Sequence, residues 1–392
     1  LYNEAENKKG MVMNMNNKNW VSVWGNAVSI AEHHPEAYAK YITLRYPVYI
    51  PFDGDTLRFT FDNYCGSEAV TVTRATVSAA TSPVYEKMPL ACPCKKETIC
   101  DITFSKNESV TMEAHQTAVS DPVSFPVKKG MTLTVSLYFA DFTLMQSAVL
   151  VTGPLSKGFF SLGDQTHADA LPMDTTKTTN WFYFLSNIEL MTAEENHTVI
   201  CYGDSITAGA WPDYLTLLAR QNPDNHTAFI RRATSGSRVL RQYECITYDS
   251  YGLKGTNRFP HEIPTTGADT VIIQQGINDI IHPVGIETNP FRPMSDLPTA
   301  KELIDGYRYY IEEAKKLHLK VYMGTLLPIF GWRTYATFRD DLRNELNAWI
   351  RSAKEIDGCI DFDLALRGSE NPSAFREGFD SGDHLHPSSK AY

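Results

Sequence analysis

The stretch HTVICYGDSITAGAWPDYLTLLARQ, residues 197–221, indicates the fold class of the C-terminal half of the chain. Its first seven residues form an apolar, β-branched run of the kind found in strands that are buried on both faces. A short GDS turn follows, and the apolar spacing of residues 211–221 then fits an amphipathic helix. A buried strand that leads through a turn into a helix is the building unit of a parallel α/β sheet.

The same order of strand and helix recurs downstream. GADTVIIQQGIND at 267–279 has the pattern of a buried strand that enters a loop, and 298–319 predicts a helix before the strand LKVYMGTLLPI. Residues 339–356 predict another helix, which leads into CIDFDLAL as a last strand. Such alternation implies a parallel sheet with helices on both faces, and ligands bind these sheets at the carboxyl ends of the strands.

Upstream of residue 191 the sequence has a different pattern. YITLRYPVYIPF, DTLRFTFDN, AVTVTRATV, MTLTVSLYFADF and WFYFLSNIEL are rich in β-branched and aromatic residues, and Gly, Pro, Asp and Asn separate them. Many short strands with turn residues predict a β-sandwich or jelly roll. We therefore expect an all-β, jelly-roll-like sandwich over 1–194 and a three-layer α/β domain with a parallel sheet over 195–392.

Composition limits the class of protein. A length of 392 residues suits two domains, and 43% hydrophobic with 21% charged residues is typical of a folded chain. The net charge of −10 disfavours binding to phosphate backbones and anionic membranes, and no apolar run approaches the roughly 18–20 residues that span a bilayer. We expect neither a nucleic-acid nor a membrane partner.

The first twenty residues lack the apolar core of a signal peptide, which predicts a cytoplasmic location. Because the sequence begins at Leu1 rather than Met, secretion after removal of a leader stays open. Seven cysteines, an odd number, fit a reducing compartment better than a disulfide framework.

Two stretches contain residues of the kind that bind metal ions. ACPCKKETIC at 91–100 has no nearby histidine and no second cysteine pair, so it predicts a reduced surface loop rather than a zinc site. His33 and His34 are adjacent, and because adjacent side chains diverge, a solvated loop is the better interpretation. We expect no metal and no cofactor.

Four short motifs lie at predicted strand ends and carry the candidate chemistry. They are GDSI at 203–206, Gly236 within ATSGSRVL, GIND at 276–279 and DHLHP at 383–387. A serine hydroxyl is a weak nucleophile unless an imidazole activates it, and a third group must fix the tautomer of that imidazole. The D-x-x-H spacing supplies the pair if the segment forms a helical turn, since residues three apart share a face.

Ser205, His386 and Asp383 are therefore the candidate nucleophile, base and orienting carboxylate. Acyl transfer also needs donors to the developing oxyanion, and the backbone N–H groups of Ser205 and Gly236 with the side-chain amide of Asn278 are the candidates. The alternative is that Ser205 is only a helix N-cap. His386 is preferred to His384, because only His386 has the D-x-x-H spacing and a following proline.

Other polar and aromatic residues near these motifs have two interpretations. Asp204 is expected to bond loop N–H groups, and Asp279 to act as an N-cap or a loop carboxylate. Trp332 and Tyr335 either line a substrate subsite or fill the core. Arg238 contacts substrate or pairs with a carboxylate, and the structural role is preferred.

GDSI, the glycine of TSGSR, GIND and DHLHP resemble, in sequence order, the four blocks of SGNH (GDSL) hydrolases. WVSVWGNA, LRFTFDNYCGSEAVTV and FDSGDHLHP are typical of a bacterial subgroup in which a β-sandwich precedes the hydrolase domain, and the chain is similar to two-domain acetyl xylan esterases. The resemblance implies Ser205 as nucleophile, His386 as base and Asp383 as its orienting group. It implies Ser205, Gly236 and Asn278 as the oxyanion hole.

We therefore expect a serine carbohydrate esterase that removes O-acetyl groups from plant polysaccharide or oligosaccharide through an acetyl-enzyme, with acetylated carbohydrate as its partner. Two alternatives stay open: an SGNH lipase or thioesterase acting on lipid or thioester acyl groups, and a non-catalytic carbohydrate-binding protein. Three roles stay open for the N-terminal sandwich, namely glycan binding, homo-oligomer formation and shaping of the active-site rim.

Overall fold

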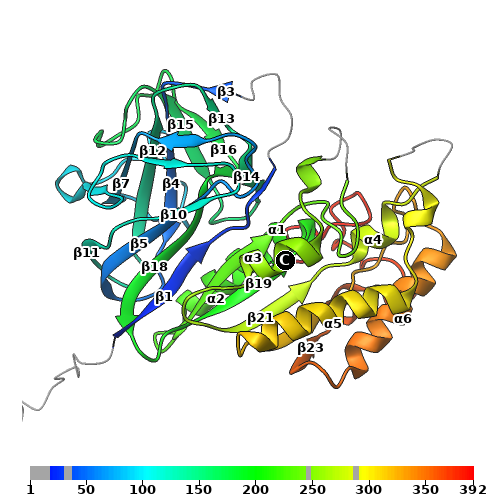
Figure 1. The fold of residues 1–392 in the computed structure, drawn as a ribbon. Coiled ribbons are helices and arrows are strands. Elements are labelled where there is room, and N and C mark those ends of the chain that lie inside the picture. Colours follow the sequence, from blue (N-terminus) through cyan, green and yellow to red (C-terminus); the bar gives the residue numbers. More distant parts are fainter. Residues whose placement is uncertain (1–17, 31–37, 244–248, 286–290) are drawn as a thin grey trace, which may run out of the picture.

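The computed structural model describes residues 18–30, 38–243, 249–285 and 291–392. Figure 1 shows two parts side by side, one made of antiparallel strands and one made of a sheet with helices. The last antiparallel strand ends at Ala193, and the first parallel strand begins at His197. His33 and His34 lie outside the described residues.

The predicted parallel sheet is confirmed and has five strands. In spatial order they are β20 (Thr227–Ala233), β19 (His197–Gly203), β21 (Ala268–Gln274), β22 (Lys320–Gly324) and β23 (Gly358–Ile360). All neighbouring pairs run parallel. The carboxyl ends of β19, β20 and β21 therefore meet at one edge, which places GDSI, Gly236 and GIND close together.

Helices connect these strands. They are α1 (Ser205–Ala208), α2 (Trp211–Arg220), α3 (Gly255–Glu262), α4 (Ile277–Ile281), α5 (Ala300–Lys316), α6 (Thr337–Ser352) and α7 (Phe362–Leu366), with 3-10 turns η2 (Asp249–Tyr251) and η3 (Met294–Asp296). The start of α5 has a capping box, in which Thr299 and Glu302 satisfy each other's backbone N–H groups. The helices predicted at 211–221, 298–319 and 339–356 are all present.

The prediction of CIDFDLAL as one strand is wrong after Ile360. Asp361 caps α7, because its carboxylate accepts the N–H of Leu364 at 3.1 Å. The guanidinium of Arg351 donates to the same carboxylate at 2.7 Å, which holds Asp361 where the helix begins. An N-cap and an ion pair, both formed through one side chain, end the strand after three residues.

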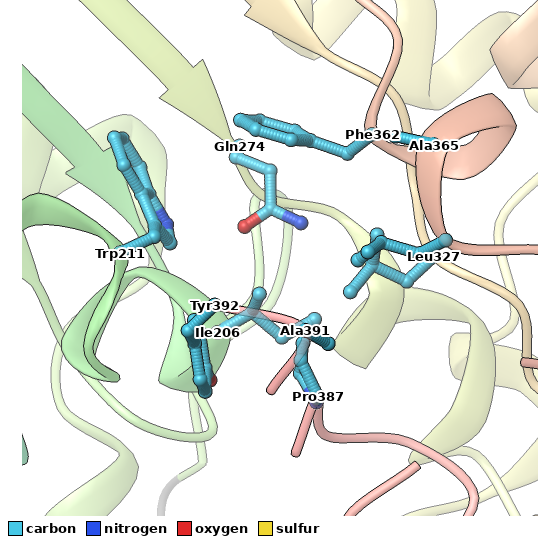
Figure 2. A pocket seen from close by; sticks show the side chains of 10 residues that line it. Ile206, Trp211, Gln274, Leu327, Phe362, Ala365, Pro387, Ala391 and Tyr392 are labelled. Atoms are coloured by element: carbon cyan, nitrogen blue, oxygen red, sulfur yellow. The ribbon is translucent and has the colours of Figure 1, made fainter. Parts of the chain in front are cut away.

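The two faces of the parallel sheet are covered differently. Val321 and Met323 of β22 are buried in the core beneath α5, whereas Tyr322 between them is half-exposed and Cys359 of β23 is exposed. Helix α2 packs on β20. Phe362 of α7 lies close to the end of β22, since a Cβ at Gly324 would lie 2.6 Å from its ring, and a pocket lies between Phe362 and Trp211 (Figure 2).

Two antiparallel sheets make up most of the N-terminal part, which confirms the prediction of a β-rich region. The first sheet contains β1 (Lys18–Gly25), β18 (Leu185–Ala193), β5 (Gly54–Asp62), β10 (Thr117–Val119) and β11 (Val123–Val127). The second contains β16 (Lys177–Thr179), β15 (Gly158–Leu162), β4 (Ile42–Tyr49), β12 (Thr132–Phe139), β7 (Arg74–Ala79) and β8 (Cys100–Ile102). A jelly-roll arrangement of these strands stays a prediction.

Short strands complete this part. They are β2 (Ser29–Ile30), β14 (Ser147–Leu150) and β17 (Trp181–Tyr183) in one sheet, β3 (Tyr38–Ala39) with β13 (Thr143–Leu144), and β6 (Val70–Val72) with β9 (Val110–Met112), besides the 3-10 turn η1 (Lys96–Thr98). In the sheet of β2, β14 and β17, strand β2 packs on the 3-10 turn η2, which follows β20 in the chain.

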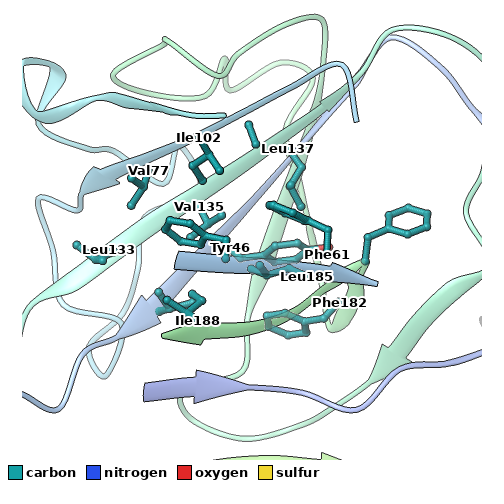
Figure 3. Close-up of a cluster of buried hydrophobic side chains, with 14 of the residues drawn as sticks. Tyr46, Phe61, Val77, Ile102, Leu133, Val135, Leu137, Phe182, Leu185 and Ile188 are labelled. Carbon is teal, nitrogen blue, oxygen red and sulfur yellow. The ribbon is translucent and has the colours of Figure 1, made fainter. Parts of the chain in front are cut away.

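One hydrophobic core joins the two large sheets. In β5 the buried residues Leu57, Phe59 and Phe61 alternate with partly exposed ones, the period of a strand with one face inside. Figure 3 shows Phe61 and Ile188 of the first sheet and Val135 of the second around the same cluster. The alternation visible in the sequence therefore marks the inner face of each sheet.

The antiparallel part packs directly on β19 and β20. Thr198 Oγ1 donates to the carbonyl of Ser22 at 2.6 Å. Arg232 of β20 is buried, and its guanidinium donates to the carbonyl of Ser186 at 2.8 Å and to Asn187 Oδ1 at 3.2 Å. A buried cation must be hydrogen-bonded, so these contacts fix the antiparallel strands against the parallel sheet.

The stretch 91–100 agrees with the predicted surface loop only in part. Lys95, Lys96 and Glu97 are exposed, whereas Cys92 and Cys94 are buried. The cause is Arg45, whose buried guanidinium donates to the carbonyl of Cys92 at 3.2 Å and to that of Gln165 at 2.7 Å. Burial raises the pKa of the Cys92 thiol to about 12, so this thiol is protonated at neutral pH.

Candidate active site

The turn after β19 presents Ser205 at the carboxyl end of the strand. Asp204 is the N-cap of α1, and its carboxylate accepts the N–H of Ile206 at 3.1 Å. A Cβ at Gly203 would lie 2.2 Å from Thr207 Oγ1, so the turn requires glycine there. The predicted structural role of Asp204 is confirmed. Burial raises the pKa of its carboxyl to about 7.

Asp383 and His386 lie in a bend, not in the helical turn that we predicted. Asp383 Oδ1 accepts the backbone N–H groups of Leu385 at 3.0 Å and His386 at 2.9 Å. Asp380 Oδ1 accepts that of His384 at 2.9 Å, and His384 has a φ of +64°. Carboxylates thus replace the helical backbone bonds, a local competition typical of Asp.

The bend brings the three predicted side chains together. Ser205 Oγ lies 2.8 Å from His386 Nε2, and His386 Nδ1 lies 2.6 Å from Asp383 Oδ2. Burial alone would raise the pKa of Asp383, but hydrogen bonds from the imidazole and N–H of His386 and from the N–H of Leu385 lower it to about 2. An ionised carboxylate at Nδ1 favours the tautomer whose Nε2 can accept the serine proton.

His384 lies elsewhere. Its Nδ1 is 2.5 Å from Asp380 Oδ2, and the structure gives it no contact with Ser205. The preference for His386 over His384 therefore agrees with the distances.

The GIND segment holds the loop that follows β20. Asn278 is buried, and its Nδ2 donates to the carbonyl of Ser237 at 3.0 Å. Asp279 accepts the N–H groups of Val239 at 2.8 Å and Leu240 at 3.0 Å, which confirms it as a loop carboxylate. An amide carries two N–H donors, and one of those of Asn278 serves this loop. The oxyanion role of Asn278 stays a prediction.

Gly236 lies in the same loop with a φ of +78°. A Cβ at this position would lie 2.2 Å from the ring of Tyr251, so the ring packs directly on the glycine backbone. Conformation and space both require glycine here. Its role as an oxyanion donor, like that of the Ser205 N–H, stays a prediction.

Sequence reasoning missed a buried arginine beneath the motifs. Arg258 of α3 donates to the carbonyl of Gly203 at 2.8 Å and to Thr234 Oγ1 at 2.8 Å, and it forms a buried ion pair with Glu262. It therefore ties the end of β19 to the end of β20. No motif marks it, because a single arginine in a short amphipathic helix is normally read as solvated.

The three predicted subsite residues lie in different surroundings. Arg238 is buried and pairs with Asp296 at 3.1 Å, which agrees with the preferred structural alternative, while its contact with substrate stays a prediction. Trp332 and Tyr335 are partly buried and pack against the core. Their loop borders the bend that contains Asp383 and His386, since a Cβ at Gly331 would lie 2.8 Å from the His384 ring.

The pocket in Figure 2 has a volume of about 150 Å³. Ser205, His386 and Asp383 do not line it, but Ile206 and Pro387, the chain neighbours of Ser205 and His386, form part of its wall. Trp211, Leu327 and Phe362 are among the other residues that line it. The pocket is therefore mainly apolar, and two chain neighbours of the candidate residues form part of its wall.

Within the residues that the structure describes, no group of three or more His, Cys, Asp or Glu side chains is arranged to hold a metal ion. Over the same residues, no helix has both the length and the apolar character needed to cross a membrane.

Comparison with known proteins concerns the C-terminal half. Residues 201–392 match the GDSL-like Lipase/Acylhydrolase family model. A GDSL-like lipase from Bacteroides thetaiotaomicron VPI-5482 is similar at 20% identity over 51% of this chain and 83% of that chain, with a TM-score of 0.36. An acetylxylan esterase from Geobacillus stearothermophilus is similar at 16% identity over 50% of this chain and 88% of that chain, with a TM-score of 0.36. No curated protein matches the chain. Residues 201–392 therefore form a domain of the GDSL-like lipase/acylhydrolase (SGNH) family.

Proposed function

We propose that this protein is a serine esterase that removes O-acetyl groups from plant polysaccharide or oligosaccharide. The observation that carries the proposal is the hydrogen-bonded series from Ser205 Oγ through the His386 ring to the Asp383 carboxylate, at 2.8 and 2.6 Å. Asp204, not Ser205, caps α1, so capping does not account for the Ser205 side chain, and its contact with the imidazole favours nucleophilic chemistry.

In the proposed reaction, His386 Nε2 takes the proton of Ser205 as Oγ attacks the acetyl carbonyl carbon. The carbonyl oxygen becomes an oxyanion and accepts hydrogen bonds from the N–H groups of Ser205 and Gly236 and from the Asn278 amide. The bond from the carbonyl carbon to the sugar oxygen then breaks, and His386 gives its proton to that oxygen, so the sugar leaves as a free hydroxyl and Ser205 stays acetylated. Water, deprotonated by His386, hydrolyses this ester and releases acetate.

The choice of an acetylated sugar rests on sequence resemblance to two-domain acetyl xylan esterases, because fold and nucleophile alone do not identify an acyl acceptor. The test is acetate release from acetylated xylan, mannan and pectin fragments by the wild type and by Ser205→Ala. We expect wild-type release on at least one substrate and its loss in the variant. No wild-type release from any of them would overturn the proposal and favour the non-catalytic alternative.

One observation favours a second candidate, a lipase or thioesterase. The pocket in Figure 2 is apolar and would suit an acyl chain. Its wall includes Ile206 and Pro387, which follow Ser205 and His386 in the sequence. This alternative predicts that p-nitrophenyl esters of long acids are hydrolysed at least as fast as the acetyl ester. Leu327→Trp would then shorten the preferred acyl chain, whereas it would leave an acetylesterase unchanged in its preference for acetyl.

A further inference from the structure

A second cavity lies where the antiparallel part meets the hydrolase domain. It has a volume of about 130 Å³, close to the roughly 150 Å³ that accepts a benzene-sized ring. Its wall combines residues of β2, β14 and β17 with residues of the loops after β20: Ser29, Val149, Leu150, Trp181, Thr234, Ser235, Ser250 and Tyr251. Neither part of the chain forms this cavity alone.

The cavity shares a wall with the candidate oxyanion hole. Ser235, which lines it, directly precedes Gly236, so their Cα atoms lie about 3.8 Å apart. The ring of Tyr251 lines the cavity and also packs on Gly236. A group in the cavity would therefore sit one residue away from the place where an ester carbonyl is expected.

Among the described residues the lining offers hydroxyl groups and aromatic rings. Ser29, Thr234, Ser235 and Ser250 contribute hydroxyls, and none of the described residues that line the cavity is Asp, Glu, Lys, Arg or His. Trp181 is partly exposed and lies opposite Leu150 in the strand pair, which gives an apolar side. A charged ligand would lack a counter-charge here, whereas hydroxyls with an aromatic face suit a neutral sugar.

Ser29 supplies an independent indication of a ligand. Only 2% of this residue is exposed, yet its Oγ has no hydrogen-bond partner within the described residues. Buried hydroxyls are normally paired, so this unpaired Oγ, which belongs to a residue of the cavity wall, can bond a polar group of a ligand once the side chain turns toward the cavity. The backbone of Gly252 lies close to it, since an added Cβ there would lie 2.3 Å from Ser29 Oγ.

We infer that this cavity is the subsite for a sugar ring of the substrate. Trp181 is its apolar platform and Ser29 a hydrogen-bond partner. The inference rests on the proposed esterase function and extends it. It assigns the antiparallel part to the rim of the active site, and it makes Trp181 a residue that determines specificity. The cavity takes the sugar that bears or adjoins the ester, while the acetyl group faces Ser205.

The first measurement is binding without turnover. In the Ser205→Ala background, isothermal titration with acetylated xylo- and manno-oligosaccharides gives the Kd. We expect Trp181→Ala to weaken binding by at least about tenfold, since stacking on an aromatic ring is lost. Trp181→Phe should recover part of the lost affinity. Phe142→Ala is the matched control, because Phe142 is an exposed aromatic residue of the same antiparallel part outside the cavity.

The second measurement is the ratio of kcat/KM for the oligosaccharide to kcat/KM for ethyl acetate, whose small alcohol does not reach the cavity. We expect Trp181→Ala to lower this ratio at least about tenfold through KM. Leu150→Trp, which fills the cavity and leaves Trp181 in place, should lower the ratio as well. Circular dichroism checks that both variants fold.

The outcomes separate the two proposals. If the wild type hydrolyses the oligosaccharide while Trp181→Ala and Leu150→Trp change neither Kd nor the ratio, the subsite is overturned and the esterase stands. If the wild type hydrolyses neither ester but binding still depends on Trp181, the esterase fails and the sugar site stands.

Discussion

The contact of 2.6 Å between His386 Nδ1 and Asp383 Oδ2 determines which imidazole nitrogen faces Ser205. The carboxylate keeps the proton on Nδ1, so Nε2 is the nitrogen available to the serine hydroxyl. The same carboxylate also holds the N–H of His386 through its other oxygen. One side chain therefore sets both the position of the base and its tautomer.

Asp383→Asn tests this double role. The amide oxygen can still accept the backbone N–H, but its NH₂ group would favour the tautomer with the proton on Nε2. We expect kcat for ester hydrolysis to fall by about 10,000-fold, as loss of tautomer control does in serine hydrolases generally. Asp380→Asn, at the carboxylate that pairs with His384, is the control. A loss below tenfold in Asp383→Asn would contradict the assigned role.

Asp204 makes stability depend on pH. Burial raises the pKa of its carboxyl to about 7, so between about pH 4 and pH 7 the folded protein retains a proton that the unfolded chain has lost. The free energy of unfolding should therefore fall as pH rises through this range. Each unit of pKa difference corresponds to about 1.4 kcal/mol, which gives an effect on the order of a few kcal/mol.

The comparison is with Asp204→Asn, which keeps an acceptor for the Ile206 N–H and cannot titrate. Urea unfolding of both proteins at pH 4 to 7 should show the wild type losing stability relative to the variant as pH rises. A difference that stays constant over this range would contradict the assignment.

At the scale of elements, the loop after β20 is positioned by the segment after β21. Asn278 and Asp279 bond this loop at Ser237, Val239 and Leu240. Two motifs that are separate in the sequence are thus one structural unit. Gly236 is the point of that unit that tolerates no side chain.

Gly236→Ala should reduce kcat/KM for ester hydrolysis by at least about 100-fold, because the loop must move to relieve the contact with Tyr251. Gly130→Ala is a matched control, since Gly130 also has a positive φ, +89°, but nothing lies within 4 Å of its added Cβ. Gly130→Ala should lower the free energy of unfolding only by the cost of a positive φ for alanine, about 1–2 kcal/mol. The double variant Gly236→Ala with Tyr251→Ala should recover part of the activity. No recovery would show that φ, not space, is decisive.

At the scale of the whole molecule, the antiparallel part and the hydrolase domain share a buried polar interface. Arg232 donates to Ser186 and Asn187 across it, and burial lowers the pKa of its guanidinium. Carbonyls left without this donor would be buried and unsatisfied. The interface therefore couples the two parts and keeps Trp181 beside the loop of Gly236.

Arg232→Ala should lower the free energy of unfolding by about 3 kcal/mol or more, because several charge-assisted hydrogen bonds are lost at once. Exposed Arg241→Ala serves as the control and should change it by less than about 0.5 kcal/mol. Calorimetry is the measurement. A wild type with two separate transitions, unaffected by Arg232→Ala, would contradict coupling of the two parts.

The sequence by itself determined the strand and helix order, the strand ends that carry the motifs and the pairing of His386 with Asp383. These depend on local periodicity, turn residues and spacing, which act over a few residues. The bend around His386 and the end of β23 at Ile360 are local as well, because the carboxylates of Asp380, Asp383 and Asp361 bond nearby backbone N–H groups in a way that periodicity does not reveal. Only the tertiary structure decided the burial of Arg238 and Cys92 and the cavity beside Trp181. Each depends on contacts between segments far apart in the chain, where a buried charge or hydroxyl takes whichever partner the packing brings near. No pattern in one segment can specify that partner.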